Sequence, residues 1–146
     1  MLKFYEFNDS LLESIEQDAE RVSIKLRAVR SETERSAAEL PPTLYRQEIR
    51  LVFDGAELGV DAPNLPSWLM EGSFRADAVD AADCEDCTDE STTIPVSLRS
   101  ASGVEITLSG LHEGTGDYVT IRVQAKSLTL EKLSSPEAMQ HTRASV

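Results

Sequence analysis

The sequence predicts an all-β fold: a single antiparallel β-sandwich or open barrel of about seven to nine strands. Three observations support this class. Alternation of apolar and polar residues is the dominant pattern, turn-forming residues separate the alternating segments, and the chain of 146 residues has the length of one domain. We expect residues 1–133 to form that β-rich domain. Residues 134–146 contain a proline and show no alternation, which predicts a flexible C-terminal tail.

The first candidate element is an ambiguous segment at residues 11–19. Ser10 and Glu13 fit the capping box of a helix, and the apolar residues after Ser10 fit one helical face. The same residues also fit a first strand, which would turn at residues 18–20 into the alternating segment that follows. We favour the strand because consecutive strands usually pair with one another. A short helical turn at 11–19 is the alternative.

Five further segments alternate apolar with polar residues, as strands with one buried face do: 22–28, 49–54, 104–109, 119–126 and 128–131. Asp54-Gly55 ends one of these strands. Ser100–Gly103 predicts a hairpin that joins residues 94–99 to 104–109, and Gly114–Asp117 predicts a second hairpin into the next strand.

Two regions between the strands show no alternation. Residues 31–42 are polar and end in Pro-Pro, which predicts a long loop or a short helical turn at 32–40. Residues 61–66 are rich in turn formers and predict a crossover, with a short helical turn at 66–71 as one reading. Trp68 is the only tryptophan, and we expect it to anchor the core beneath this crossover.

The chain is strongly acidic, with 14 Lys and Arg against 26 Asp and Glu and a net charge of −12. This charge repels a phosphate backbone and an anionic membrane, so we expect neither as a partner. It attracts basic proteins and divalent cations, although solubility alone would also explain it. No run approaches the roughly 20 apolar residues of a membrane span. Glu6 lies where a signal peptide would be apolar, which predicts a cytoplasmic protein.

The acids are concentrated from Asp77 to Glu90, a stretch with seven carboxylates and no base. Both cysteines lie in it, as Cys84-Glu-Asp-Cys87, a spacing that supplies half of a zinc site. The candidate metal ligands are Asp83, Cys84, Asp86, Cys87 and Asp89, with Asp77 and Asp80 added for a hard cation such as calcium, and His112 and His141 as the only imidazoles. A redox pair is disfavoured because the neighbouring acids oppose thiolate formation. An incidental pair of reduced cysteines in a solvated loop is the simpler interpretation.

Motifs of catalysis and phosphate binding are missing from the sequence, so we expect no cofactor and favour a protein that is not an enzyme. His112 lies at a strand end, where a general base can sit, but a solvated loop histidine is the simpler interpretation. Asp9-Ser10 is expected to cap a turn through side-chain oxygens that bond backbone N–H groups, rather than to catalyse a reaction.

Phe7-Asn8-Asp9-Ser10, followed by apolar residues and a polar turn into residues 22–26, resembles the opening of a loose group of small, uncharacterised bacterial all-β proteins. In that group Phe-His-Asp-Ser is the commoner form, so Asn8 departs from it. Ile94-Pro95-Val96 and the closing Ser127–Glu131 are similar to later strands of the same group, and the resemblance spans residues 7–133. It implies an all-β fold and no activity. Some bacterial toxin-immunity proteins open similarly, which implies a protein partner.

Together these patterns predict a non-catalytic, soluble interaction protein whose acidic surface meets a basic protein partner, in a role like that of an immunity protein. One alternative is a β domain that binds a divalent metal through the acidic Cys-x-x-Cys loop. Another is an enzyme or accessory subunit whose site forms only in the fold. The sequence leaves the oligomeric state open.

Overall fold

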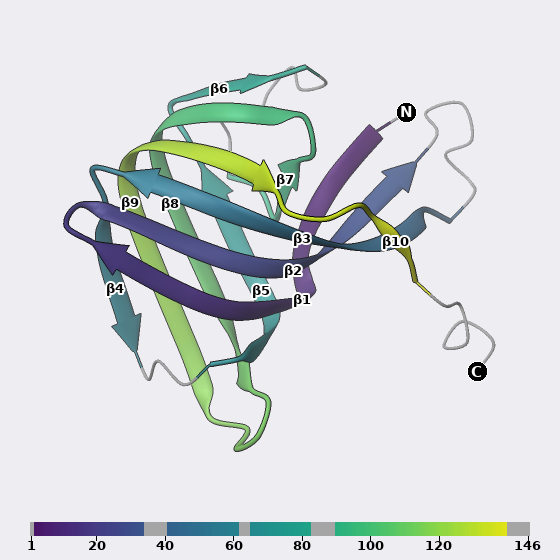
Figure 1. The fold of residues 1–146 in the computed structure, drawn as a ribbon, viewed down its shortest axis with the longest axis horizontal. Coiled ribbons are helices and arrows are strands. Elements are labelled where there is room, and N and C mark those ends of the chain that lie inside the picture. The colour runs from purple at the N-terminus through teal and green to yellow at the C-terminus, as the bar shows by residue number, and fades with distance from the viewer. Residues whose placement is uncertain (1, 34–40, 62–64, 83–89, 140–146) are drawn as a thin grey trace.

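The computed structural model shows a chain built from antiparallel β-strands (Figure 1). It describes residues 2–33, 41–61, 65–82 and 90–139. Within these ranges there are ten strands and no helix, which confirms the predicted all-β class. A helix long and apolar enough to cross a membrane is accordingly not found in the described residues.

Six of the strands pair in a ring, in the order β1–β2–β3–β9–β8–β5 and back to β1. The ring closes because β3 pairs with β9 as well as with β2, which makes a six-stranded barrel. The other four strands, β4, β6, β7 and β10, extend its margins. The bounds are β1 (Leu2–Asp18), β2 (Arg21–Thr33), β3 (Thr43–Asp54), β4 (Glu57–Asp61), β5 (Ser67–Arg75), β6 (Ala78–Ala81), β7 (Thr93–Pro95), β8 (Leu98–His112), β9 (Tyr118–Lys132) and β10 (Glu137–Ala138).

Inward-facing apolar side chains fill the barrel. The alternation predicted for the central strands is confirmed, because its apolar members are buried apart from the half-buried Leu130; Ile24, Leu51, Ile106 and Ile121 are fully buried. The largest fully buried side chains are Tyr5, Phe7, Leu12, Ile24, Leu26, Ile49, Leu51, Phe53, Phe74, Ile94, Ile106 and Leu108. Side chains of this size occupy the interior that a small barrel encloses.

β1 bends sharply at Asp9 and Ser10 (Figure 1). Asp9 has a φ of +67°, and the pairing of β1 with β2 skips from Glu6 to Leu11. The Ser10 hydroxyl accepts a hydrogen bond from the backbone N–H of Val29 at 3.0 Å and donates one to the Glu6 carbonyl at 2.5 Å. The prediction that Asp9-Ser10 caps a turn is wrong: the Ser10 oxygen does bond a backbone N–H, but it does so across the β1–β2 pair at a β-bulge.

The bend allows β1 to change partners along its length. Before the bend β1 pairs with β7, and after it β1 pairs with β5 through Leu11 and Leu12 alone, opposite Trp68 and Ser67. The seam between β1 and β5 therefore consists of two residue pairs. The favoured strand at 11–19 is confirmed through Asp18, and the helical alternative there is wrong.

The hairpin predicted at Ser100–Gly103 is wrong, because these residues lie within β8, which continues through them. Gly103 instead adopts a φ of +60° beside the incoming Asp77, whose backbone N–H donates to the carbonyls of Ser102 and Gly103. A Cβ at Gly103 would meet the Asp77 carboxylate at 2.0 Å. The small residues Ser102 and Gly103 thus leave room for Asp77 to pack against β8, and they do not reverse the chain. The hairpin predicted at Gly114–Asp117 is confirmed and joins β8 to β9.

The helical turn considered at 66–71 is wrong, since these residues enter β5. Of the turn considered at 32–40, residues 32 and 33 belong to β2 and the rest lie outside the described residues. The first part of the expected tail, residues 134–139, returns to the barrel: Glu137 and Ala138 pair with β3. Residues 140–146 lie outside the described part.

A polar cluster closes one end of the barrel. The Tyr5 hydroxyl donates to Gln47 Oε1 at 2.7 Å, and Arg30 Nη1 donates to the same oxygen at 2.9 Å. Arg30 Nε also bonds Glu32 Oε2 at 3.0 Å. Burial raises the pKa of Tyr5 to about 12, against the opposing effect of the nearby Arg30 guanidinium. The neutral phenol is thus the form that this cluster accommodates.

Replacing Gly110 is expected to destabilise the barrel. A Cβ at Gly110 would lie 2.1 Å from the backbone oxygen of Trp68, so β5 would have to move away from β8. We expect Gly110→Ala to lower the free energy of unfolding by about 2–3 kcal/mol in urea denaturation. Gly59→Ala is the matched control, because its Cβ would meet nothing closer than the Arg122 carbonyl at 3.9 Å. Equal stability of the two variants would contradict the close approach of β5 and β8.

Stability is expected to fall in strong alkali because of Tyr5. The pKa of its phenol is raised in the folded protein to about 12, above an unfolded value of 10.0. Its stabilising contribution is therefore complete below an unfolded pKa of about 10 and is lost as the pH rises toward 12, at a rate of at most about 1.4 kcal/mol per pH unit. Denaturation curves at several alkaline pH values measure this slope. The slope should be shallower in Tyr5→Phe, and an unchanged slope would show that another group is responsible.

Candidate functional site

An apolar row crosses the outer face of four neighbouring strands. Leu11, Trp68, Leu111 and Tyr118 pair in register from β1 through β5 and β8 to β9. Trp68 is 39% exposed, Leu111 40% and Tyr118 54%, while Leu11 is half-buried. Met70, also 54% exposed, lies two residues beyond Trp68 on β5. We call these five residues the outer apolar row.

Strand alternation explains why the row faces outward. Successive side chains of a strand point to opposite faces of the sheet. The neighbours Leu12, Leu69 and Val119 are buried in the barrel, so the residues beside them point to the outside. Single exposed apolar residues are common on protein surfaces, but a contiguous group across four strands is typical of an interaction site.

The expected core position of Trp68 is wrong. Leu69, which is 3% exposed, takes the inward position, and the indole lies on the surface. The Arg46 guanidinium lies 5.5 Å from the centre of the Trp68 ring, and its Nη1 donates to the Asp9 carbonyl at 2.6 Å. This cation–π contact fixes the indole against the bulge of β1 while leaving much of the ring accessible.

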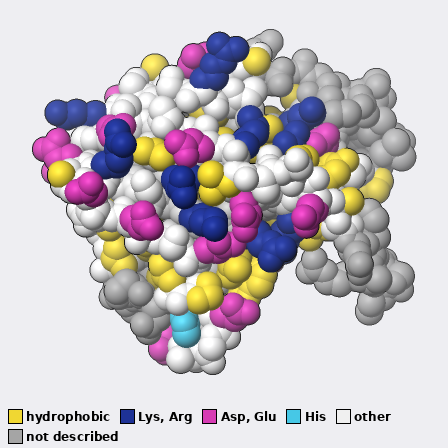
Figure 2. All heavy atoms as spheres, viewed as in Figure 1, with side chains coloured by type: hydrophobic (Ala, Val, Ile, Leu, Met, Phe, Trp, Pro, Cys, Tyr) yellow, Lys and Arg dark blue, Asp and Glu magenta, His cyan; other side chains and the backbone are white. Residues whose placement is uncertain are grey.

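Charged residues flank the outer apolar row, and most of them are acidic. Four exposed carboxylates lie one or two residues from a member of the row: Asp9, Glu71, Glu113 and Asp117. Two cations accompany them, Arg27 opposite Leu11 and Arg46 over Trp68. We call the four carboxylates the acidic rim. In Figure 2 the lower half of the face, around the turn from β8 to β9, shows hydrophobic side chains interspersed with carboxylates.

His112 is the last residue of β8, where the turn into β9 begins. Its Nδ1 accepts a hydrogen bond from the Thr115 N–H at 3.1 Å, and the Thr115 hydroxyl donates to Asp117 Oδ2 at 2.9 Å. The backbone N–H of His112 donates to the Asp117 carbonyl at 2.8 Å. These bonds shape the turn that carries Tyr118 at its far end. His112 Nδ1 is thus engaged within the turn, and the choice between a loop histidine and a general base stays a prediction.

The candidate metal ligands are not brought together in the described part of the chain. Asp83, Cys84, Asp86, Cys87 and Asp89 lie outside the described residues, as does His141. Asp77 and Asp80 are described, and Asp77 lies over Gly103. Among the described residues no three His, Cys, Asp or Glu side chains are grouped as a metal site. The metal hypothesis therefore gains no support from these ranges.

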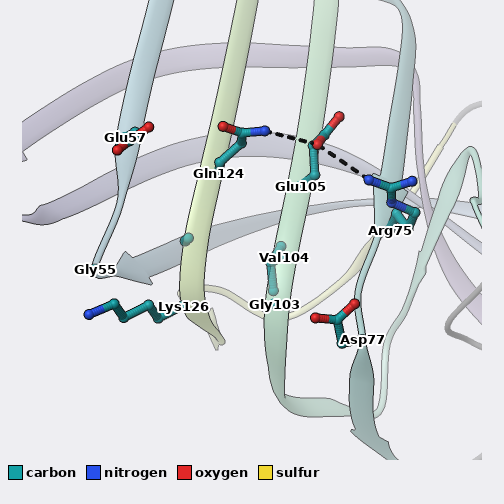
Figure 3. Close-up of a pocket in the computed structure, with 10 residues that line it drawn as sticks. Gly55, Glu57, Arg75, Asp77, Gly103, Val104, Glu105, Gln124 and Lys126 are labelled. Atoms are coloured by element: carbon teal, nitrogen blue, oxygen red, sulfur yellow. Dashed lines mark hydrogen bonds and ion pairs between the residues drawn. The ribbon is translucent and has the colours of Figure 1, made fainter.

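A hollow of about 350 Å³ on the outer face of β8 and β9 is a second candidate (Figure 3). Its central carboxylate, Glu105, accepts hydrogen bonds from Gln124 and Arg122, each at 3.1 Å, and from Arg75 at 3.5 Å. The Gln124 amide, followed by the two guanidinium groups, lowers the pKa of Glu105. These partners lie on β5 and β9, the two strands beside β8. Glu105 therefore links neighbouring strands of the sheet, and its carboxylate oxygens are already engaged.

Sequence reasoning missed most of the outer apolar row. Leu111 and Tyr118 flank a predicted turn, and Leu11 lies in a segment whose strand or helix state is ambiguous, so their patterns indicate no surface. A usable signal was present: Tyr118 precedes the alternating run 119–126 and shares the outward phase of its polar members. An aromatic residue in a polar phase is an indication of a functional surface.

Compared with protein-family models, curated proteins and solved structures, the chain matches none. The resemblance of its opening tetrapeptide to small bacterial all-β proteins therefore stays a prediction. What remains is the geometry of the surface: four exposed apolar side chains and the half-buried Leu11 in one group, with acids around them.

The fluorescence of Trp68 should show an accessible indole. The chain has one tryptophan, so the emission reports this position alone. We expect the native emission to lie close to that of the unfolded chain and to be quenched readily by acrylamide, because the ring is 39% exposed. Arg46→Gln should increase the quenching by removing the guanidinium from the ring face. A strongly blue-shifted, protected emission would instead indicate the core position that the sequence predicted.

Proposed function

We propose that this chain is a non-catalytic interaction protein that binds a basic protein partner through the outer apolar row and the acidic rim. The observation that carries the proposal is the row itself, which is exposed, contiguous and built on paired strands. Rigid strands hold its side chains in fixed positions, so binding requires little ordering of the surface.

The composition of the row suits a binding hot spot. Tryptophan, tyrosine and methionine are enriched at protein interfaces, where a few buried aromatic anchors supply most of the affinity. Trp68 and Tyr118 each offer a broad apolar surface with a polar group at one end. A partner that covers them with aliphatic side chains would remove this area from water, which is the dominant favourable term in association.

Charge indicates the kind of partner. The acidic rim and a net charge of −12 attract a basic surface and steer its approach. The same charge opposes a second copy of this chain, because two acidic rims would face each other across a symmetric interface. Covering and neutralising a basic protein, as an immunity protein does, is the role that this combination serves best.

Affinity capture with matched variants tests the proposal. Leu111→Ser removes the centre of the row, whereas Leu133→Ser removes an equally exposed leucine at the opposite end of β9 from Tyr118. We expect the wild-type protein and Leu133→Ser to retain the same basic protein from a lysate of the source organism, and Leu111→Ser to lose it. With the purified partner, binding can be followed by the change in Trp68 fluorescence. Because Leu111 pairs with Trp68, we expect Leu111→Ser to bind with a Kd about 30-fold weaker than that of the wild-type protein.

Salt and rim variants provide the second arm. Glu71→Gln with Glu113→Gln should slow association and reduce its dependence on ionic strength, because rim charges act mainly on the encounter rate. Capture of a neutral or acidic protein, or equal capture by all the variants, would overturn the proposal. Circular dichroism of each variant shows whether a lost interaction reflects an altered fold.

A further inference from the structure

A separate pocket lies at the same end of the barrel as the polar cluster of Tyr5, Arg30 and Gln47. It has a volume of about 540 Å³, within the range of small-molecule sites. Its walls come from the start of β1, the end of β2, the middle of β3, the segment after β7, and the end of β9 with the residues that follow it. The mouth of a β-barrel is a common position for a ligand site. The pocket shares no residue with the outer apolar row.

All the charged residues in the wall of this pocket are cations. Lys3, Arg30 and Lys132 line it, and no carboxylate does so among the described residues. Neither lysine forms an ion pair within the described part of the chain. Three cations converge on one cavity in a protein with a net charge of −12. In the described ranges only Arg30 has a carboxylate partner, Glu32, so the two lysines add uncompensated positive charge to this wall, and a bound anion would stabilise the arrangement.

Arg30 is fixed in this wall. It is only 9% exposed, its Nη1 is bonded to Gln47 and its Nε to Glu32. Nη2 has no partner among the described residues and remains as a donor for a ligand. Gln47 is itself held by the Ser134 carbonyl at 2.7 Å. The guanidinium is therefore oriented before any ligand binds, which reduces the entropy lost on binding.

We propose that this pocket binds a phosphate dianion, either free or as the phosphoryl group of a small organic ester. Phosphate is recognised by charged hydrogen bonds from arginine and by lysines that act as mobile charges, and here Arg30 Nη2 and the two lysines supply such donors. The volume exceeds that of the ion alone, and Val96 and Pro136 supply an apolar wall for an organic group.

Calorimetric titration tests the site with two probes, inorganic phosphate and phenyl phosphate, at constant ionic strength in chloride. We expect saturable binding of at least one probe to the wild-type protein. Tighter binding of phenyl phosphate would identify an ester as the ligand type, and tighter or equal binding of inorganic phosphate would identify the free ion. Both results support the site, whereas the absence of saturable binding for either probe overturns it.

Lysine variants locate the binding and avoid the buried cluster. Lys3→Gln and Lys132→Gln should each weaken binding by about tenfold, because each removes a charged donor. Lys126→Gln, which changes the net charge equally but lies in the hollow of Figure 3, should leave the Kd unchanged. Equal weakening by all three would show a general charge effect and overturn the proposal. Leu111→Ser should bind phosphate normally, so failure of this site and failure of the proposed partner surface are distinguishable.

Discussion

Closure of the sheet depends on the bulge in β1. A strand that continued straight past Asp9 would keep β7 as its neighbour, and β5 would have no partner on that side. The Ser10 hydroxyl makes the bulge stable by bonding the backbone of both β1 and β2, so that the local loss of ladder hydrogen bonds is compensated. Everything that lies across β1 and β5, including the position of Trp68, follows from this one corner.

The sequence predicted the fold class and the interior better than the connections. Burial on one face forces a period of two, and this period is visible in residues 22–28 and 119–126 without any knowledge of their partners. Connections are harder because small polar residues favour several backbone geometries. At Gly103 they accommodate Asp77 within a continuous strand, whereas at Gly116 they form a true turn, and the difference is made by a segment distant in sequence.

The candidate site was less predictable than the core. Adjacent apolar residues such as Trp68 and Leu69 leave the phase of a strand undecided, since either can face inward. Pairing with β8 decides which of the two residues faces inward. Gly110 of β8 lets β5 and β8 approach closely beside Trp68 and Leu69. The polar cluster was hidden for a similar reason: Tyr5, Arg30 and Gln47 come from three strands, and only their register brings them together.

The seam between β1 and β5 gives the outer apolar row a second property. Only two residue pairs join these strands, while β1 and β2 are paired along most of their length. Leu11 and Trp68 lie on opposite sides of this seam and belong to the same row. A molecule that covers both would act as a clamp across the shortest ladder of the barrel. Binding would then stabilise the barrel against opening between β1 and β5. As more of the protein is bound by its partner, the lifetime of the folded state would increase.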